Sequence, residues 1–302
     1  MNDVREVLKK YDITPLGYFK INDDVIKINS RDKTYVLKKV KHSNKDIYNI
    51  LNVRGFKYAP NIYNLDSEDK YYIEDYYEDS DMIPYDKALD IVNLTSLLHN
   101  KTTIVNNVSI DDYKKIYEDT IEKINEMVTY YNELNNYIDT EIYMSPSSYL
   151  LVRNISKIYA SLDFCKKELD NWESLVKTLT KQRNVLINNN LELNHLLKND
   201  RESVLLSWDK AKYDMPIYDI YNFYKKIYKT TDFDSLFSIY LSKYPLTKEE
   251  LKLFFVIISL PWKIDDNNDS EYDRQVKVLE LLIYLDKTEK IVSKYYTDNE
   301  KE

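Results

Sequence analysis

The chain has 302 residues, 43% of them hydrophobic and 31% charged, and this composition excludes an intrinsically disordered protein. Its formal net charge of −8 argues against general nucleic-acid binding, because such binding depends on basic contacts to phosphate. The sequence contains only two glycines, which excludes a phosphate-binding loop built from several glycines.

Residues 1–80 predict an N-terminal lobe made of a small antiparallel sheet with one helix between its strands. The predicted strands are short, rich in β-branched and aromatic residues, and bounded by turn residues. They cover 25–28, 35–40, 62–65 and 71–76. The intervening helix is expected at 44–54, with Ser43 as its N-cap and Gly55 ending it. A further short helix is expected at 1–10, and the acidic stretch from Glu74 to Asp81 is interpreted as a hinge.

Residues 81–302 predict a helical C-terminal lobe, and the chain as a whole therefore has an α+β pattern. The predicted helices have apolar residues at three- and four-residue spacing. They cover 85–99, 111–138, 147–179 and most of the chain from Tyr218 onward. Pro245 precedes a helix whose first turn contains Thr247 and Glu250, a pattern typical of a helix start.

Cys165 is the single cysteine, so no disulfide can form within the chain and a cytoplasmic location is expected. The N-terminal residues lack the apolar core of a signal peptide, and no apolar run is long enough to span a membrane. A protein partner is expected, whereas nucleic acid is not.

The segment from Val185 to Ile220 is the most informative part of the sequence. Two hydrophobic runs flank a polar turn, followed by Ser207-Trp208-Asp209 and then Pro216-Ile217-Tyr218-Asp219. This segment resembles the active-site segment of aminoglycoside phosphotransferases, which contains His-Gly-Asp-Leu, an Asn, Asp-Trp-Asp or Asp-Trp-Glu, and Pro-x-x-Asp-Leu. Within that superfamily, the stretch Ser207–Lys212 is most similar to the spore-coat CotS group. The resemblance covers nearly the whole chain and implies the two-lobed protein-kinase-like fold.

The resemblance also implies a degenerate active site. Asn188 stands where the family has its His, Asn190 replaces the catalytic Asp, His195 replaces the magnesium-binding Asn, and Ser207 replaces the magnesium-binding Asp. An amide cannot accept a proton near neutral pH, a hydroxyl is a weak magnesium ligand, and imidazole prefers softer metals. We therefore expect no catalytic residue, no metal and no cofactor in this segment.

Other residues match the scaffold of the family. Lys38 fits the strand lysine that reaches nucleotide phosphates, although the predicted helix offers only Asp46 as its partner. Trp208 is expected to fill apolar space, and Asp219 to accept hydrogen bonds from the loop backbone. Lys38 could equally be a solvated strand lysine. His195 is interpreted as a polar residue bonded within its loop in preference to a metal ligand.

Two functions follow from these residues. The first is a pseudokinase with a binding or structural role, related to the spore coat and associated with spores. The alternative is an ATP-dependent phosphotransferase that acts on a hydroxyl group with Mg-ATP. In that case Asp209 or Asp200 would supply the missing carboxylate. Asp209 is two positions from Ser207, and in an extended segment it would keep to the same side.

Overall fold

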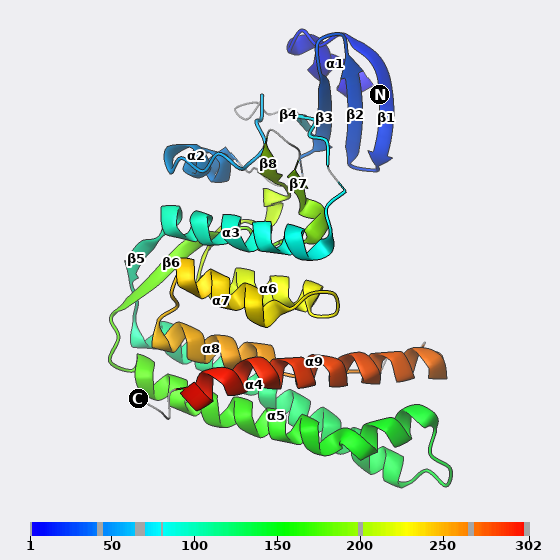
Figure 1. Ribbon diagram of the computed structural model, residues 1–302, viewed down its shortest axis with the longest axis vertical. Helices are drawn as coiled ribbons and strands as arrows, with labels where there is room; N and C mark the ends of the chain where they lie inside the picture. Colours follow the sequence, from blue (N-terminus) through cyan, green and yellow to red (C-terminus); the bar gives the residue numbers. More distant parts are fainter. Residues whose placement is uncertain are drawn as a thin grey trace. The chain divides into compact units, whose positions relative to one another are not determined.

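A computed structural model of the chain describes residues 2–40, 45–63, 70–79, 81–198, 202–264 and 269–298 (Figure 1). It divides into two compact units, each of which is described separately below. The first unit combines Met1–Thr103 with Val185–Asp214, and the second combines Ile104–Asn184 with Met215–Glu302. The boundary expected between residues 80 and 81 stays a prediction.

The first unit contains a four-stranded antiparallel sheet whose strands follow chain order. These strands are β1 (Pro15–Asn22), β2 (Val25–Ser30), β3 (Thr34–Lys39) and β4 (Tyr71–Asp75). Helix α1 (Asn2–Lys10) covers one face of the sheet. The apolar side of α1 and the inward residues of the strands form one core cluster, made of Val4, Val7, Leu8, Ile28, Leu37 and Ile73. The helix at 1–10 and the strands corresponding to β2, β3 and β4 are confirmed, whereas β1 was not predicted.

The predicted helix at 44–54 is confirmed as α2 (Lys45–Val53). Gly55 follows it with a φ of +66°, a conformation that glycine adopts without steric cost, and it ends the helix as expected. The expected cap Ser43 and the predicted turn at 66–69 lie outside the described residues. Of the predicted strand at 62–65, the structure describes a single β-bridge between Ile62 and Glu74. Glu74 itself belongs to β4, so the stretch interpreted as a hinge begins inside the sheet.

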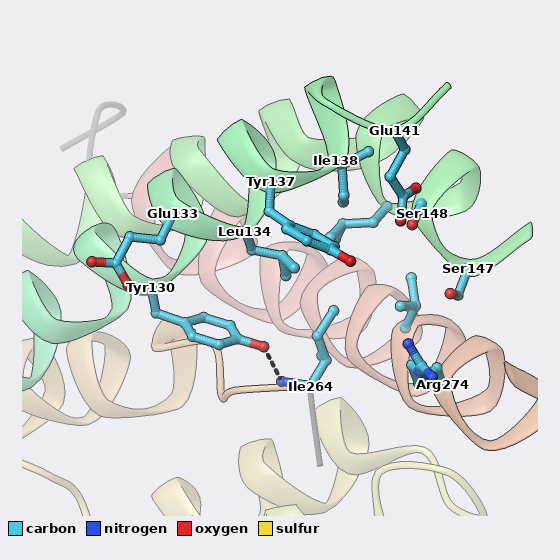
Figure 2. A pocket seen from close by; sticks show the side chains of 12 residues that line it. Tyr130, Glu133, Leu134, Tyr137, Ile138, Glu141, Ser147, Ser148, Ile264 and Arg274 are labelled. Carbon is cyan, nitrogen blue, oxygen red and sulfur yellow. Dashed lines mark hydrogen bonds between the residues drawn. The ribbon is translucent and has the colours of Figure 1, made fainter. Parts of the chain in front are cut away.

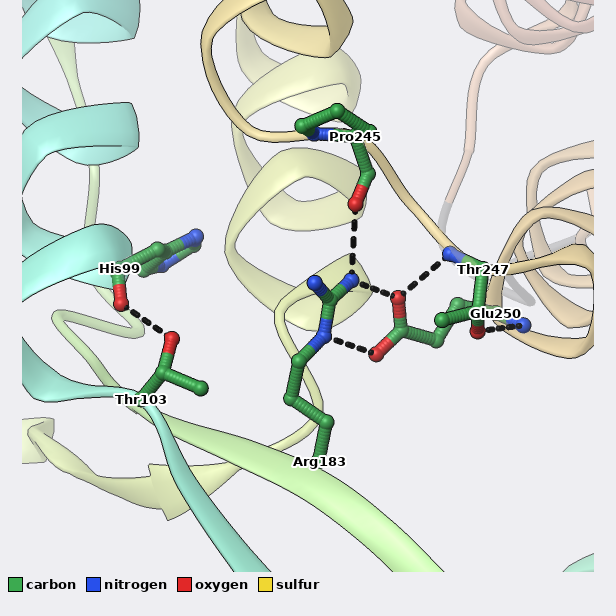
Figure 3. Close-up of polar contacts among 6 residues, drawn as sticks. All are labelled: His99, Thr103, Arg183, Pro245, Thr247 and Glu250. Carbon is green, nitrogen blue, oxygen red and sulfur yellow. Dashed lines mark hydrogen bonds and ion pairs between the residues drawn. The ribbon is translucent and has the colours of Figure 1, made fainter.

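A second group of short strands in the first unit surrounds the polar loop of the motif segment. β6 (Lys181–Ile187) pairs through its last three residues with β9 (Lys212–Asp214), while β7 (Leu196–Lys198) pairs with β8 (Ser203–Leu205). Helix α3 (Pro84–Thr102) contacts these strands through an ion pair, in which Lys198 Nζ on β7 lies 2.6 Å from Asp90 Oδ2. At the end of α3, the Thr103 hydroxyl donates to the His99 carbonyl at 2.6 Å (Figure 3).

The second unit is mainly helical. Its helices are α4 (Ile110–Asp139), α5 (Pro146–Val176), α6 (Ile217–Ile227), α7 (Phe233–Lys243), α8 (Lys248–Ser259) and α9 (Glu271–Asp298). Helix α5 packs against α4, α8 and α9, so it forms the centre of the unit. One short strand, β5 (Ile104–Asn107), pairs with the first half of β6. Cys165 on α5 is fully buried, and burial raises the pKa of its thiol.

The start of α8 is fixed by a polar cluster (Figure 3). Thr247 and Glu250 form a capping box, in which each side chain accepts a hydrogen bond from the backbone of the other residue. The same carboxylate accepts two hydrogen bonds from Arg183 on β6, and Arg183 also donates to the Pro245 carbonyl at 2.9 Å.

The elements of the two units confirm the predicted α+β fold class, with a small antiparallel sheet and a larger helical part. No helix among the described residues is long and apolar enough to cross a membrane.

Candidate functional site

Lys38 forms an ion pair with a neighbouring strand and not with a helix. In the strand register Lys38 faces Tyr72, which makes Glu74 its diagonal neighbour on the same face of the sheet. Lys38 Nζ lies 2.5 Å from Glu74 Oε1. Glu74 is only 2% exposed, and its second oxygen has no hydrogen-bond donor among the described residues. Asp46, the acidic side chain that the predicted helix offers, is exposed on α2, and the partner of Lys38 is the strand residue Glu74 instead.

Three further side chains of the first unit share the environment of this ion pair. Tyr48 is one of two buried residues on α2, Tyr72 precedes Glu74 by two residues on β4, and Asp209 follows Trp208 in the motif segment. Burial raises the pKa of Tyr72, and the negative charges of Glu74 and Asp209 raise it further. Burial likewise raises the pKa of Glu74, although the ammonium group of Lys38 opposes the shift. The environment therefore combines the buried carboxyl group of Glu74 with the phenols of Tyr48 and Tyr72, and the exposed Asp209 adds negative charge to it.

The polar loop after β6 is held together by its own amides. Asn188 is fully buried, and its Oδ1 accepts a hydrogen bond from the Asn190 N–H at 3.1 Å. The Asn188 amide donates to the carbonyls of Leu206 and Ser207 at 3.3 and 3.4 Å. His195 Nδ1 lies 2.6 Å from the Asn190 carbonyl oxygen. The structure thus brings four of the predicted site residues into one network, in which His195 is bonded within its loop.

The backbone of the motif segment is bent at Ser207. Its φ of 62° and ψ of 59° lie in the left-handed region, which is unfavourable for a non-glycine residue and costs on the order of 1–3 kcal/mol. A 3₁₀ helix, Trp208–Lys210, follows immediately. The segment is therefore not extended, so the alternation on which the role of Asp209 was argued does not hold here. The other candidate, Asp200, lies outside the described residues. The Trp208 ring is buried against Phe56 at a centroid distance of 5.7 Å, and its indole N–H donates to the Leu205 carbonyl at 2.7 Å.

Asp219 lies in the first turn of α6, in the second unit, and is fully buried. Burial raises the pKa of Tyr240, and the negative charge of Asp219 adds to this effect. The contact expected between Asp219 and the loop backbone stays a prediction. Over the described ranges, no group of three or more His, Cys, Asp or Glu side chains is arranged to hold a metal ion.

Sequence reasoning missed Glu74, Tyr48 and Tyr72 as members of this site. A signal for Glu74 was present, since the alternating strand 71–75 places Tyr72 and Glu74 on one face and Ile73 on the other. The register between β3 and β4, which makes Glu74 the diagonal neighbour of Lys38, cannot be obtained from alternation alone.

No family model matches the chain, and a search of curated proteins found no relative. Solved structures do match it. An aminoglycoside phosphotransferase from Alicyclobacillus acidocaldarius is 11% identical, with 99% of this chain and 96% of that chain covered and a TM-score of 0.70. Spectinomycin phosphotransferase APH(9)-Ia, solved with ADP and spectinomycin, is 13% identical, with 95% and 97% covered and a TM-score of 0.53. The fold implied by the motif segment is thereby confirmed: the chain has the protein-kinase-like fold of the aminoglycoside phosphotransferases.

Proposed function

We propose that this chain is a catalytically degenerate kinase-like protein, a pseudokinase, with a binding or structural role. The observation that carries the proposal is the residue set of the motif segment, Asn190, His195 and Ser207. Phosphoryl transfer requires a carboxylate to orient the attacking hydroxyl and anionic ligands to hold Mg²⁺ against the phosphates. These three side chains supply an amide, an imidazole and a hydroxyl, and none of them carries a negative charge at neutral pH.

The partner of Lys38 differs from that of the corresponding lysine in active protein kinases. There the strand lysine pairs with a glutamate on a helix, and this ion pair is part of the active arrangement. Here the paired carboxylate is Glu74 on the neighbouring strand β4, 2.5 Å away. We infer that this arrangement, together with the uncharged side chains of Asn190, His195 and Ser207, does not fit Mg-ATP.

Thermal denaturation of the full chain tests the proposal directly. We expect that ATP with Mg²⁺ leaves the melting temperature unchanged within error, both with and without EDTA. Binding to the native state at a hundredfold excess over the dissociation constant would add about 2.7 kcal/mol of stability, which such a measurement detects. A magnesium-dependent increase that disappears with EDTA and in a Lys38→Ala variant would overturn the proposal.

An atypical phosphotransferase that acts on a hydroxyl group with Mg-ATP is the second candidate. Asp209 favours it, because its charge acts on the same phenol, Tyr72, as that of Glu74. It would then be the acidic residue that replaces the missing carboxylates. Transfer of phosphate from ATP to an alcohol, lost in Asp209→Ala and kept in the exposed control Asp23→Ala, would support this candidate. Absence of transfer by the unaltered chain across a broad panel of alcohols would count against it.

The similarity of Ser207–Lys212 to the spore-coat CotS group supports a structural role in the spore, held by contacts with protein partners. Antibody detection in purified spores and in growing cells of the source organism tests this role. We expect the protein in spores, together with the partners recovered by cross-linking. Its presence only in growing cells would contradict a spore-coat role.

A further inference from the structure

The second unit contains a cavity of about 430 Å³ where α4 ends, α5 begins and the first turns of α9 pass by (Figure 2). Its aliphatic lining residues include Leu134, Ile138, Leu151 and Val278. Tyr130 is fixed beside the cavity, since its hydroxyl accepts a hydrogen bond from the Ile264 N–H at 3.2 Å. The volume falls within the range that small organic ligands occupy in proteins. None of its lining residues belongs to the motif segment or to the Lys38–Glu74 pair.

Glu141, just beyond the end of α4, contributes an unsatisfied carboxylate to this cavity. Its Oε2 is shielded from solvent and receives no hydrogen bond from the described residues. Nearby Glu271 differs, because it accepts hydrogen bonds from the Ser147 N–H at 2.7 Å and from the Ser147 hydroxyl at 3.0 Å. A shielded carboxylate oxygen without a donor is costly, and a ligand ammonium group would satisfy both its charge and its hydrogen-bonding capacity.

Arg274 contributes the opposite charge from the first turns of α9. It is exposed, and within the described residues its guanidinium donates a long hydrogen bond of 3.4 Å to the Asp269 carbonyl. Figure 2 shows Arg274 and Glu141 on the border of the same cavity. A guanidinium offers several N–H donors in one plane, a geometry that matches a carboxylate. The cavity therefore combines an acceptor for a cation, a donor for an acid and apolar lining residues.

We propose that this cavity binds a free amino acid with an apolar side chain. The ligand ammonium group donates to Glu141, the ligand carboxylate accepts from Arg274, and the side chain lies against Leu134, Ile138 and Leu151. Either charge of the ligand alone would leave Glu141 or Arg274 uncompensated, whereas Glu133, the third charged side chain of the lining, is exposed to solvent. The zwitterion with an apolar body is thus the chemical class that satisfies all three features together.

Calorimetric titration of the full chain with L-leucine tests the proposal. Two probes that each lack one charged group, 3-methylbutylamine and 4-methylpentanoate, serve as ligand controls. We expect L-leucine to bind and both fragments to bind at least about tenfold more weakly, the loss typical of a charge-assisted hydrogen bond. If 3-methylbutylamine binds as tightly as L-leucine, the cavity recognises a simple cation, and the proposal of a zwitterionic ligand is overturned. Failure of L-leucine, L-methionine and L-phenylalanine to bind at millimolar concentration would overturn the site.

Variants of the chain test whether L-leucine binds at this cavity and not elsewhere on the surface. Glu141→Gln and Arg274→Gln each should weaken L-leucine binding about tenfold or more, while Glu122→Gln should leave it unchanged. Glu122 is an exposed carboxylate on α4 that does not line the cavity, so it is a matched control. Circular dichroism of each variant shows whether it is folded before titration. Unchanged affinity in a folded Glu141→Gln variant would overturn the proposal.

Discussion

At the residue scale, Lys38 and Glu74 link two neighbouring strands through a largely buried ion pair. Lys38 is the cation that compensates Glu74 among the residues that the structure describes, and it is mostly enclosed, with 18% of its side chain exposed. Removing one member leaves the other charge buried without its partner, which costs about 3–5 kcal/mol. We therefore expect Glu74→Ala to lower the free energy of unfolding by about 3 kcal/mol in urea titrations.

The double variant Lys38→Met with Glu74→Leu is the control for this prediction. Because it removes both charges and keeps apolar volume, we expect it to recover most of the stability that Glu74→Ala loses. A double variant no more stable than Glu74→Ala would show that shape, and not charge compensation, explains the loss. An effect of Glu74→Ala below about 1 kcal/mol, the range of an exposed pair, would contradict the buried character of the pair.

The contacts of a single residue could be predicted from the sequence when its partner is close in the chain, and not when the partner is distant. The bonding of His195 within its own loop was predicted, since its partner Asn190 is five residues away. The partner of Lys38 was not predicted, because Glu74 is distant in the chain and meets Lys38 only through the pairing of β3 with β4. The role of Asp209 was argued from an extended backbone, whereas the left-handed turn at Ser207 changes the direction of every following side chain.

At the element scale, Glu250 connects the start of α8 to the first residues of β6. It forms the capping box with Thr247, and its carboxylate also accepts hydrogen bonds from two nitrogens of Arg183. Glu250 is buried, so its removal leaves the guanidinium without a counter-charge. We expect Glu250→Ala to lower the free energy of unfolding by about 3 kcal/mol. The measurement is urea denaturation of the full chain, followed through its helical circular dichroism.

Asp112 provides the matched control. It occupies the same position in the capping box at the start of α4, where Ser109 is the cap, but it is exposed and has no arginine partner among the described contacts. We expect Asp112→Ala to have a clearly smaller effect than Glu250→Ala. Equal losses in the two variants would mean that the cap, and not the pairing with Arg183, accounts for the contribution of Glu250.

The elements that the sequence predicted well are those with a local signal. Helix α8 was located because Pro245, Thr247 and Glu250 mark its start before an apolar run. Strand β1 was missed because its apolar and polar residues do not alternate along the sequence, and Gly17 interrupts the pattern. In the structure its apolar residues Leu16, Phe19 and Ile21 are all exposed. Strand β5 was missed because it has four residues, two of them Asn.

At the scale of the whole molecule, the 30 tyrosines link stability to alkaline pH. Both units contain buried phenols. Burial raises the pKa of Tyr48 and Tyr284 well above the ordinary value of 10.0, and it raises the pKa of Tyr224 to about 12. A phenol is neutral while it holds its proton, and these folded-state pKa values exceed the unfolded one. The stability they contribute is therefore complete below about pH 10 and is lost as the pH rises through the folded-state values.

Titration of the whole chain with base should consequently show two steps. Exposed phenols ionise near pH 10 while the helical circular dichroism is unchanged, and the buried phenols ionise only as that signal is lost. Tyr240→Phe should move the second step to higher pH, because one buried phenol that favours the unfolded state at high pH is removed. The exposed control Tyr272→Phe should not move it. Ionisation of all phenols in one step near pH 10, with the helical signal intact, would contradict the burial of these tyrosines.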